Sequence, residues 1–524
     1  MKVLVTDPLS EEGLSVLREA GFTVDVKTEL DATGLKRILA PYDAWLLRSG
    51  TKVTAELLDA AKNLKVVGRA GVGVDNIDVE AATARGIVVM NTPHGNTLSV
   101  AEHTIALMLA LCRHVAEGTR SLKQGKWLRK ELTGTEVAGK TLAILGLGRI
   151  GKEVAKRAQG LEMNVIAYDP FITREVAKEF GIELLDLPAI WPRADFISVH
   201  VPLTAKTKGL VDKDAFGRMK KGVRILNVAR GGVIEEMALL AAIQDGTVAG
   251  AALDVFEVEP PVDSALVNRP EVIATPHLGA STREASLRVG VQIAEQVVTY
   301  LTKGQAIDAV NLAASPDPAT APFMPLAQAL GAWAIQLGKG QPIGIHLAAR
   351  GEASKGQTQV LTDAALKGLL EIAHGGGGRV TLVNARRVAQ ESGFKVTETA
   401  LADSPTYPAL LAVTVTTTEG VVTVSGTNFG VLGPRVVGVD GYEVEIKPHG
   451  RFLVLRHKDT PGTISRVSGL LGDHDVNIAQ MVVGRLAPRG DAISIMRVDD
   501  PIPDAVLDAL RTAKRFESVN RVEV

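Results

Sequence analysis

The stretch Ala143-Ile-Leu-Gly146-Leu-Gly148-Arg149-Ile150-Gly151 decides the fold of this 524-residue chain. It begins as a short apolar strand, passes through the pattern G-x-G-x-x-G and continues into an amphipathic helix. In such a turn Gly146 permits the tight bend, Gly148 lets backbone N–H groups approach phosphates, and Gly151 lets helix and strand pack closely. The positive end of the helix dipole then faces the phosphates. The pattern therefore predicts a Rossmann-type site for a dinucleotide.

An acidic residue follows the next predicted strand, residues 164–168. Asp169 can accept hydrogen bonds from both adenosine ribose hydroxyls, and its charge repels a ribose 2′-phosphate. Pro170 rather than an arginine comes next, although Arg174 lies only a little further on. We therefore expect NAD rather than NADP as the cofactor, and no metal ion.

Length and composition are typical of a large soluble enzyme, and we expect it to be cytoplasmic. The length exceeds what one hydrophobic core supports, so we expect roughly three or four domains. Lys and Arg number 58 against 59 Asp and Glu, which predicts neither a nucleic-acid nor a membrane partner. Residues 1–7 are typical of a strand rather than a secretory signal, and the apolar run 104–112 is too short to span a bilayer. Cys112 is the only cysteine, so no intrachain disulfide can form, and its apolar surroundings favour an inert buried thiol.

Strands and helices alternate through the first three hundred residues, which predicts parallel α/β architecture. The first series of strands carries no glycine fingerprint, and a long apolar helix from about Ser99 to His114 leads into the dinucleotide unit. A helix from near Thr282 toward Leu301 then returns the chain to the first series. We expect a Rossmann-type NAD-binding domain, residues 98–284, inserted in a discontinuous flavodoxin-like substrate domain, residues 1–97 and 285–312. The cleft between them is the expected active site.

The pattern of residues changes after a proline-rich linker, residues 313–325, which indicates that a new module begins there. An α+β module is predicted for residues 313–449, with helices and β-rich runs such as 412–417 and 421–424. Four consecutive glycines, 375–378, could cradle an anion, but the absence of a preceding strand favours a flexible turn. Residues 450–524 show a β-α-β-β-α-β order, which predicts a ferredoxin-like domain.

Three candidate catalytic residues each follow a different predicted strand of the dinucleotide unit: Arg230, Glu259 and His277. Parallel strands of an open α/β sheet place ligands at their carboxyl ends, so these side chains should meet. An arginine can fork onto a carboxylate, and a glutamate beside a histidine fixes its tautomer and stabilises imidazolium. Each residue alone has an ordinary structural explanation; three of them after one cofactor fingerprint predict oxidation of an alcohol.

At these residues the chain resembles the D-isomer-specific 2-hydroxyacid dehydrogenases. The resemblance implies that Arg230 binds the substrate carboxylate and hydroxyl oxygen, His277 accepts the hydroxyl proton and Glu259 supports His277, while hydride passes from C2 to the nicotinamide. The motifs that carry it are Arg69-Ala-Gly-Val-Gly-Val-Asp75-Asn76, Asn91-Thr-Pro-His-Gly-Asn96, the glycine fingerprint, His200-Val-Pro-Leu, Asn227-Val-Ala-Arg230-Gly-Gly, Ala252-Leu-Asp254-Val-Phe-Glu257, Glu259-Pro260 and Pro276-His277-Leu-Gly-Ala.

The same resemblance implies the residues that meet the cofactor. Backbone amides of Arg149 and Ile150 would face the pyrophosphate, Asp169 the adenosine ribose, and Asp254 the carboxamide. Many relatives carry threonine where this chain has Val72 and Val201, so those two contacts would be apolar or through the backbone. The whole expected set is Val72, Gly146, Gly148, Arg149, Ile150, Gly151, Asp169, Val201, Val228, Ala229, Arg230, Asp254, His277, Gly279 and Ala280.

Within the family the chain is similar to the long branch that oxidises 3-phospho-D-glycerate to 3-phosphooxypyruvate, the first step of L-serine biosynthesis. Arg129 and Lys130 lie in an excursion that would complete a neighbour's phosphate site, or they form a solvated surface pair; the sequence leaves both open. The patterns also do not exclude glycerate or hydroxypyruvate as substrate. The expected substrate-binding residues are Arg48, Thr51, Arg69, Asn96, Arg230 and His277.

The carboxy-terminal half resembles a regulatory half. Residues 313–449 are similar to the intervening domain of the long branch, and residues 450–524 to an ACT domain, which commonly pairs with another copy and binds an amino acid. His457, Asp459 and Asn477 fall where serine-binding residues lie in relatives that serine inhibits, so L-serine is a candidate effector. A turn aspartate and a helix-end asparagine explain two of these residues equally well. The branch implies a homotetramer.

Two other functions remain open. A glyoxylate or hydroxypyruvate reductase on the same scaffold would explain the first half of the chain but not the appended half. A cofactor-sensing corepressor of this family would keep NAD binding and even the three catalytic residues, but it would be expected to carry a disordered tail instead of an ordered small-molecule module.

Overall fold

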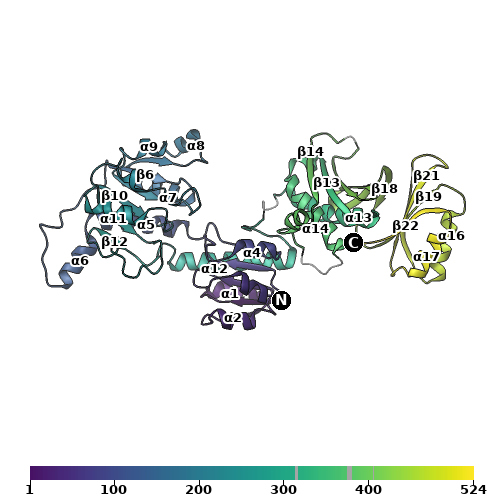
Figure 1. Cartoon of the computed structure of the whole chain (residues 1–524), viewed down its shortest axis with the longest axis horizontal. Helices are drawn as coiled ribbons and strands as arrows, with labels where there is room; N and C mark the ends of the chain where they lie inside the picture. Colours follow the sequence, from purple (N-terminus) through teal and green to yellow (C-terminus); the bar gives the residue numbers. More distant parts are fainter. Residues whose placement is uncertain (313–316, 375–379, 405) are drawn as a thin grey trace.

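The computed structural model describes residues 1–312, 317–374, 380–404 and 406–524. Its strands form four β-sheets, one for each lobe or module of the chain. Figure 1 shows these bodies arranged along the longest axis, with the dinucleotide fingerprint at one end and the ferredoxin-like module at the other. The predicted α/β fold class is confirmed.

The substrate lobe, formed by residues 1–90 and the helix α12 (Arg283–Lys303), contains a five-stranded parallel sheet in the order β2-β1-β3-β4-β5. This is the flavodoxin-like order that the sequence predicts. Helix α12 packs on α1 and β4, and Val289, Ile293 and Val297 complete the core, so the lobe is discontinuous. Its other elements are β1 (Lys2–Val5), α1 (Glu11–Glu19), β2 (Thr23–Val26), α2 (Ala32–Ile38), β3 (Ala44–Leu47), α3 (Ala55–Ala60), β4 (Val66–Arg69), α4 (Val79–Ala84) and β5 (Val88–Met90).

The nucleotide lobe contains a seven-stranded parallel sheet in the order β12-β11-β10-β9-β6-β7-β8. Its chain order reverses beside β6, which places a ligand crevice at the end of that strand. The two-residue strand β8 has no counterpart in the prediction, because two residues carry no periodicity. The elements are α5 (Thr97–Cys112), α6 (Val115–Lys123), β6 (Thr141–Leu145), α7 (Arg149–Gly160), β7 (Asn164–Tyr168), α8 (Arg174–Glu179), β8 (Glu183–Leu184), α9 (Leu187–Ile190), β9 (Phe196–Val199), α10 (Lys213–Phe216), β10 (Val223–Asn227), α11 (Glu236–Gln244), β11 (Val248–Leu253) and β12 (Val272–Ala274).

Helices α5 and α12 connect the two lobes. Their first turns meet through a 2.8 Å hydrogen bond between the hydroxyls of Ser99 and Thr282. Cys112 at the end of α5 is fully buried, as predicted, and burial raises the pKa of its thiol.

Within the described ranges no single helix is long and apolar enough to cross a membrane. Only α5 and α6 taken together have the length and composition of a membrane span, and they are bent by 62° at their junction.

The intervening module contains a six-stranded mixed sheet in the order β14-β13-β15-β16-β17-β18, with α13 and α14 packed side by side on it. The predicted linker is too long: its end is helical, because proline is tolerated in the first turn of α13. Residues 313–316 of the linker and the predicted glycine turn at 375–378 lie outside the described residues. The elements are η1 (Ala321–Phe323), α13 (Met324–Leu337), β13 (Pro342–Gly351), η2 (Glu352–Lys355), α14 (Thr358–Ala373), α15 (Ala385–Glu391), β14 (Lys395–Leu401), β15 (Ala409–Thr417), β16 (Gly420–Asn428), η3 (Gly430–Leu432), β17 (Pro434–Val439) and β18 (Tyr442–Ile446).

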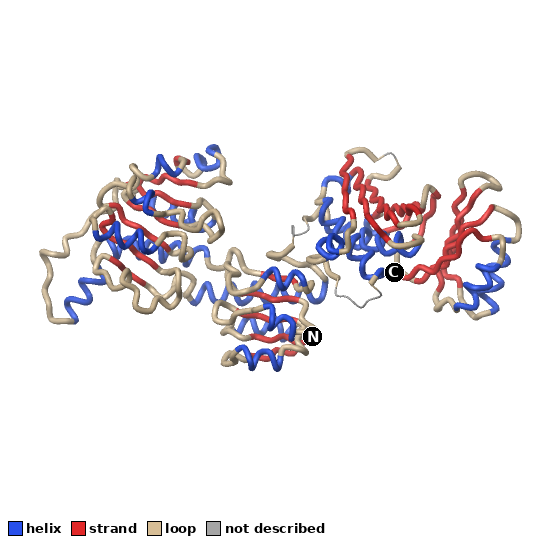
Figure 2. The backbone as a smooth tube through the Cα atoms, viewed as in Figure 1, coloured by secondary structure: helices blue, strands red, loops and turns tan. Residues whose placement is uncertain are grey.

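The last module is an antiparallel sheet in the order β20-β21-β19-β22, which confirms the ferredoxin-like prediction. Its two helices lie on the side away from the intervening module (Figure 2). The opposite sheet face joins the core of the intervening module, where Trp333 and Phe452 pack with ring centroids 4.6 Å apart. The two modules therefore share one hydrophobic core. The elements are β19 (Arg451–Lys458), α16 (Thr463–Asp473), β20 (Ile478–Arg485), β21 (Asp491–Val498), α17 (Asp504–Thr512) and β22 (Phe516–Glu523).

Candidate active site

A cleft of about 290 Å³ lies between the carboxyl ends of the two parallel sheets. Residues from both lobes line it, so neither lobe forms the site alone. The predicted site residues that line the cleft are Arg48, Arg69, Val72, Asn96, Ile150, Val201, Val228, Ala229, Arg230, Asp254, His277, Gly279 and Ala280.

His277 and Glu259 form the pair that the sequence predicts. The imidazole Nδ1 lies 2.8 Å from one carboxylate oxygen of Glu259, and the other oxygen accepts a 3.1 Å hydrogen bond from the backbone N–H of Phe256. Both side chains are partly exposed, 49% for His277 and 38% for Glu259. Because Nδ1 is engaged by the carboxylate, Nε2 is the ring nitrogen available to take a proton from a ligand.

Arg230 follows strand β10 and lies across the cleft mouth. Its Nε donates to a carboxylate oxygen of Asp75 at 3.0 Å, and one of its Nη atoms donates to the carbonyl of Ala229 at 2.7 Å. The side chain of Asn227 donates to the Arg230 carbonyl at 2.9 Å and so fixes the backbone from which the guanidinium extends. The remaining N–H groups of the guanidinium have no such protein acceptor in the described residues.

Two further arginines, Arg48 and Arg69, line the cleft and make one of its walls positively charged. Arg69 ends strand β4, and burial together with the charge of Arg230 lowers the pKa of Arg69 to about 10, so it remains charged at neutral pH. Its Nε and the side-chain oxygen of Asn96 are both buried without a hydrogen-bond partner in the part of the chain that the structure describes. Buried polar atoms of this kind are normally satisfied, and here a polar ligand in the cleft could satisfy them.

Thr51 does not line the cleft as the sequence led us to expect. Its hydroxyl is 3.0 Å from the hydroxyl of Thr6 and 3.0 Å from a carboxylate oxygen of Asp7. The other Asp7 oxygen accepts the backbone N–H groups of Arg48 and Thr51 at 2.6 and 3.1 Å. Thr51 therefore helps to hold the loop that carries Arg48. Arg129 and Lys130 are exposed and are not among the cleft residues.

The glycine fingerprint is built for close packing at two positions and for open space at the third. A Cβ on Gly151 would lie 2.1 Å from the carbonyl oxygen of Gly146, so helix α7 can approach strand β6 only without a side chain there. Gly146 has a φ of 100°, which favours glycine. Gly148 precedes α7, and a Cβ at this position would have no atom within 4 Å, which leaves room for phosphate beside the helix N-terminus.

Asp169 lies at the end of β7, beside this turn. Its two carboxylate oxygens accept the backbone N–H groups of Leu147 and Phe171, each at 2.9 Å. The carboxylate thus ties the first turn of the fingerprint to the next strand and keeps acceptor capacity for a ribose. Together with the open space at Gly148, this arrangement fits a dinucleotide.

Asp254 is almost fully buried below the cleft. Burial raises its pKa, but hydrogen bonds from His103, Thr275 and the backbone of Leu278 and Gly279 outweigh this effect and hold the pKa of Asp254 below its ordinary value. The backbone N–H groups lie 2.7 Å from the carboxylate. Since this loop also carries His277, the buried carboxylate fixes the position of the candidate base.

Sequence reasoning missed three residues of the site. Asp75 stands inside a quoted motif but nothing in the linear pattern pairs it with Arg230. His103 lies on the apolar helix α5, 3.4 Å from Asp254, with no signal for that contact. His200 lines the cleft and lies 2.8 Å from the hydroxyl of Ser198, and its Nδ1 is buried without a partner among the described residues. Each is brought to the site by contacts between distant segments.

The three candidate effector residues are not brought together within one chain. Strands β19 and β20 are both antiparallel to β21, so they run in the same direction. His457 and Asp459 lie where β19 ends, whereas Asn477 immediately precedes the start of β20, at the other end of the sheet. Asn477 donates to Asp499 at 2.7 Å, and Asp459 accepts from the side chain of Arg485 at 3.3 Å. The expected clasp around an amino acid therefore does not form in a single copy.

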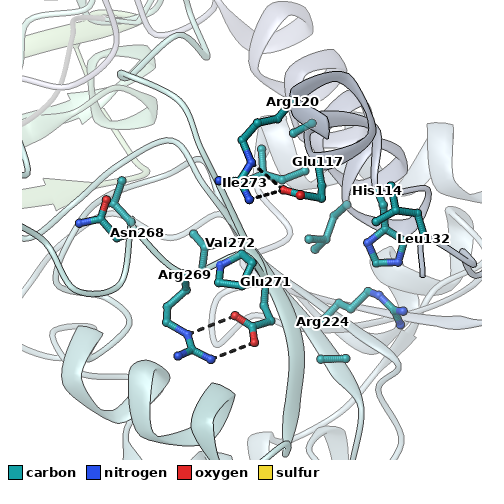
Figure 3. Close-up of a pocket in the computed structure, with 15 residues that line it drawn as sticks. His114, Glu117, Arg120, Leu132, Arg224, Asn268, Arg269, Glu271, Val272 and Ile273 are labelled. Atoms are coloured by element: carbon teal, nitrogen blue, oxygen red, sulfur yellow. Dashed lines mark hydrogen bonds and ion pairs between the residues drawn. The ribbon is translucent and has the colours of Figure 1, made fainter. Parts of the chain in front are cut away.

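Another pocket, of about 450 Å³, lies where β10, β11 and β12 begin, away from their carboxyl ends. Figure 3 shows two ion pairs in this pocket: Arg269 pairs with Glu271, and Arg120 with Glu117. Because these charges are already paired and the pocket lies away from the fingerprint, we do not assign the chemistry to it.

Comparison with family models divides the chain as the architecture does. Residues 105–279 match the NAD binding domain of D-isomer specific 2-hydroxyacid dehydrogenases, residues 319–440 the D-3-phosphoglycerate dehydrogenase intervening domain, and residues 451–515 the ACT domain. The chain therefore carries an NAD-binding domain.

Curated relatives match over their full length. The D-3-phosphoglycerate dehydrogenase of Archaeoglobus fulgidus is 45% identical, over 97% of each chain. That of Bacillus subtilis is 42% identical, over 100% of this chain and 99% of the relative. Among solved structures, D-lactate dehydrogenase from Aquifex aeolicus complexed with NAD and lactic acid is 29% identical, with a TM-score of 0.52 over 59% of this chain and 99% of that one.

A methyl group added at Gly148 should affect the protein differently from one added at Gly151. Gly148→Ala should leave the thermal midpoint unchanged but weaken NAD binding at least about tenfold, because the added group enters the space left for phosphate. Gly151→Ala should lower stability by about 1–3 kcal/mol as well, because its Cβ meets the Gly146 carbonyl. Calorimetric titration with NAD and thermal unfolding measure the two effects. Equal thermal midpoints for the two variants would contradict this account.

His200 should make the protein sensitive to acid. Burial lowers the pKa of His200 to about 4, so the folded state resists a proton that the unfolded chain accepts below its ordinary value of 6.5. Stability from the neutral imidazole is therefore complete above pH 6.5 and is lost as pH falls toward 4. His200→Gln should reduce the loss of unfolding free energy between pH 7.5 and pH 5 by on the order of 1–3 kcal/mol, which is seen as a smaller drop in thermal midpoint. His374→Gln, at an exposed site, is the control. An identical drop in both variants would contradict the role given to His200 in acid sensitivity.

Proposed function

The chain belongs to the D-3-phosphoglycerate dehydrogenases of the D-isomer specific 2-hydroxyacid dehydrogenase family, and from this premise we propose that it oxidises 3-phospho-D-glycerate to 3-phosphooxypyruvate with NAD. The observation that carries the proposal is the His277–Glu259 pair, 2.8 Å apart, in which His277 lines one cleft with Arg230 and two further arginines. This is the first step of L-serine biosynthesis. We also propose that the protein works in the cytoplasm.

The proton and the carboxylate have separate partners in this mechanism. His277 accepts the C2 hydroxyl proton at Nε2, and Glu259 stabilises the imidazolium that results through its 2.8 Å hydrogen bond to Nδ1. Arg230 holds the substrate carboxylate with the N–H groups that its protein partners leave free. A bound NAD would supply the acceptor for the hydride that leaves C2. The fingerprint residues, Asp169 and Asp254 hold the dinucleotide in this proposal.

Selection for a phosphorylated acid comes from the substrate lobe. Arg48 and Arg69 line the cleft on the side opposite His277, and a second anionic group on the substrate gives them a partner. Asn96 supplies a further polar contact from the start of α5. A substrate with only one carboxylate would leave these cations without a counter-charge. The assignment of Arg129 and Lys130 to a neighbour's site stays a prediction, as do the exact domain limits at 97/98 and 284/285.

Initial rates of NADH formation test the proposed reaction. The full chain with NAD should strongly prefer 3-phospho-D-glycerate over D-glycerate at matched concentration, and His277→Ala should lower kcat by roughly 10²–10⁴-fold. His474→Ala, an exposed histidine after α16, is the control and should keep full activity. Equal or better use of D-glycerate would move the assignment to a reductase, and no turnover with intact NAD binding would favour a cofactor-sensing protein.

For regulation, we propose that L-serine binds between two copies of the chain, since one copy separates Asn477 from His457 and Asp459. Pairing of two ACT domains would place Asn477 of one copy opposite His457 and Asp459 of the other. This arrangement requires at least two copies, and we propose that such pairs form part of the homotetramer that the long branch implies.

Mixed oligomers test the shared serine site. Asp459→Ala and Asn477→Ala should each abolish serine binding in calorimetric titration of the pure variant. Co-folding equal amounts of the two variants should restore about a quarter of the sites, because about half of the pairs are mixed and each mixed pair contains one site with both substitutions and one with neither. No recovery in the mixture would contradict a site shared between copies.

A further inference from the structure

Asp75 of the substrate lobe reaches across the cleft to Arg230 of the nucleotide lobe. The two residues are far apart in the chain, and a 3.0 Å contact joins Asp75 Oδ2 to Arg230 Nε. Asp75 lies in the loop after β4, and Arg230 lies in the loop after β10. A carboxylate beside a substrate-carboxylate receptor needs an explanation, since it lowers the positive charge available to an anionic substrate.

The side chain of Arg230 can reach Asp75 because residue 73, which it passes, is a glycine. A Cβ on Gly73 would lie 1.9 Å from Arg230 Nη2, so the side chain of Arg230 crosses directly over this glycine. Arg230 Nη1 is at the same time held by the carbonyl of Ala229 at 2.7 Å. Two fixed acceptors on different edges set the plane of a guanidinium, because its N–H groups lie in one rigid fork.

Stability of the fold does not account for this ion pair. The Asp75 side chain is 64% exposed and that of Arg230 is 29% exposed, and pairs at such exposure contribute little to folding. The contact instead constrains the direction in which the guanidinium of Arg230 points. Of the five N–H groups of Arg230, one on Nε goes to Asp75 and one on Nη1 to Ala229, which leaves three for a ligand.

We propose that Asp75 is a positioning residue for Arg230: it binds Nε across the cleft and thereby aims the remaining N–H groups of the guanidinium at the substrate carboxylate. Because the two residues belong to different lobes, the aim of Arg230 depends on how closely the lobes approach each other. The proposal rests on the role given above to Arg230, and it adds a residue from the opposite lobe that makes that role conditional on the cleft geometry.

Neighbouring charges agree with this role. Asp75 raises the pKa of Arg69, opposing the lowering effects of burial and of Arg230. Arg48 and Asp7 also act on Arg69 and complete the charges that surround it. The Asp75 carboxylate therefore offsets the repulsion between Arg230 and Arg69 while the cleft holds no anion.

A double-mutant cycle tests the proposal in the full chain. Asp75→Asn should lower kcat/KM for 3-phospho-D-glycerate roughly 10–100-fold, with an unchanged thermal midpoint and unchanged NAD affinity, because a misaimed group costs rate without loss of fold. In an Arg230→Lys background the same change should cost less than about threefold, because the group being aimed is already gone. Asp59→Asn breaks a comparably exposed ion pair with Arg85 elsewhere in the lobe and should have no kinetic effect.

A binding probe separates this inference from the proposed reaction. Oxamate carries the carboxylate of a 2-oxo acid but no phosphate, and its calorimetric titration into the protein with NADH should be at least tenfold weaker for Asp75→Asn than for Asp59→Asn. If the unaltered chain fails to oxidise 3-phospho-D-glycerate but oxamate shows this difference, the reaction assignment fails and the positioning role stands. Full additivity in the cycle, or tighter oxamate binding by Asp75→Asn, would overturn the positioning role.

Discussion

The active site depends on two parallel sheets that turn their carboxyl ends toward one cleft. Every residue proposed to act on the substrate lies at the end of one of these strands, in the loop that follows it, or just before the connecting helix α5. A parallel strand ends its backbone hydrogen bonding at that edge, so its loop is free to carry polar groups. The connecting helices α5 and α12 hold the two edges opposite each other, and without them the cleft would have one wall.

Charge in the cleft is balanced by pairs that cross between segments. Glu259 faces His277, Asp75 faces Arg230, and Asp7 holds the loop that carries Arg48. Glu259 and Asp75 fix the direction of the ring and the guanidinium that they face, and Asp7 fixes the backbone next to Arg48. The buried Asp254 does the same for the backbone of the His277 loop. The rigidity of the site thus comes from acidic residues that hold the catalytic and binding groups in place.

The carboxy-terminal half forms a unit of its own. The ACT sheet packs its open face on the intervening module, and the rings of Trp333 and Phe452 join the two cores. The contact with the substrate lobe is much smaller: the hydroxyl of Thr381 donates to the Gly86 carbonyl at 3.0 Å, and Val383 packs against the lobe's core. The ACT domain and the intervening module are therefore packed together as one unit.

The sequence by itself determined the fold class and the three catalytic candidates, because glycine spacing, strand periodicity and the order of polar residues after strands are local properties of the chain. It also led to NAD through Asp169, the first acidic residue after β7. Only the tertiary structure decided that Thr51 supports a loop, that Asp75 and His103 belong to the site, and that Asn477 lies far from His457 in one copy. Those facts depend on which segments meet across a cleft or along a sheet, and strand direction and lobe contact leave no local trace in the order of residues.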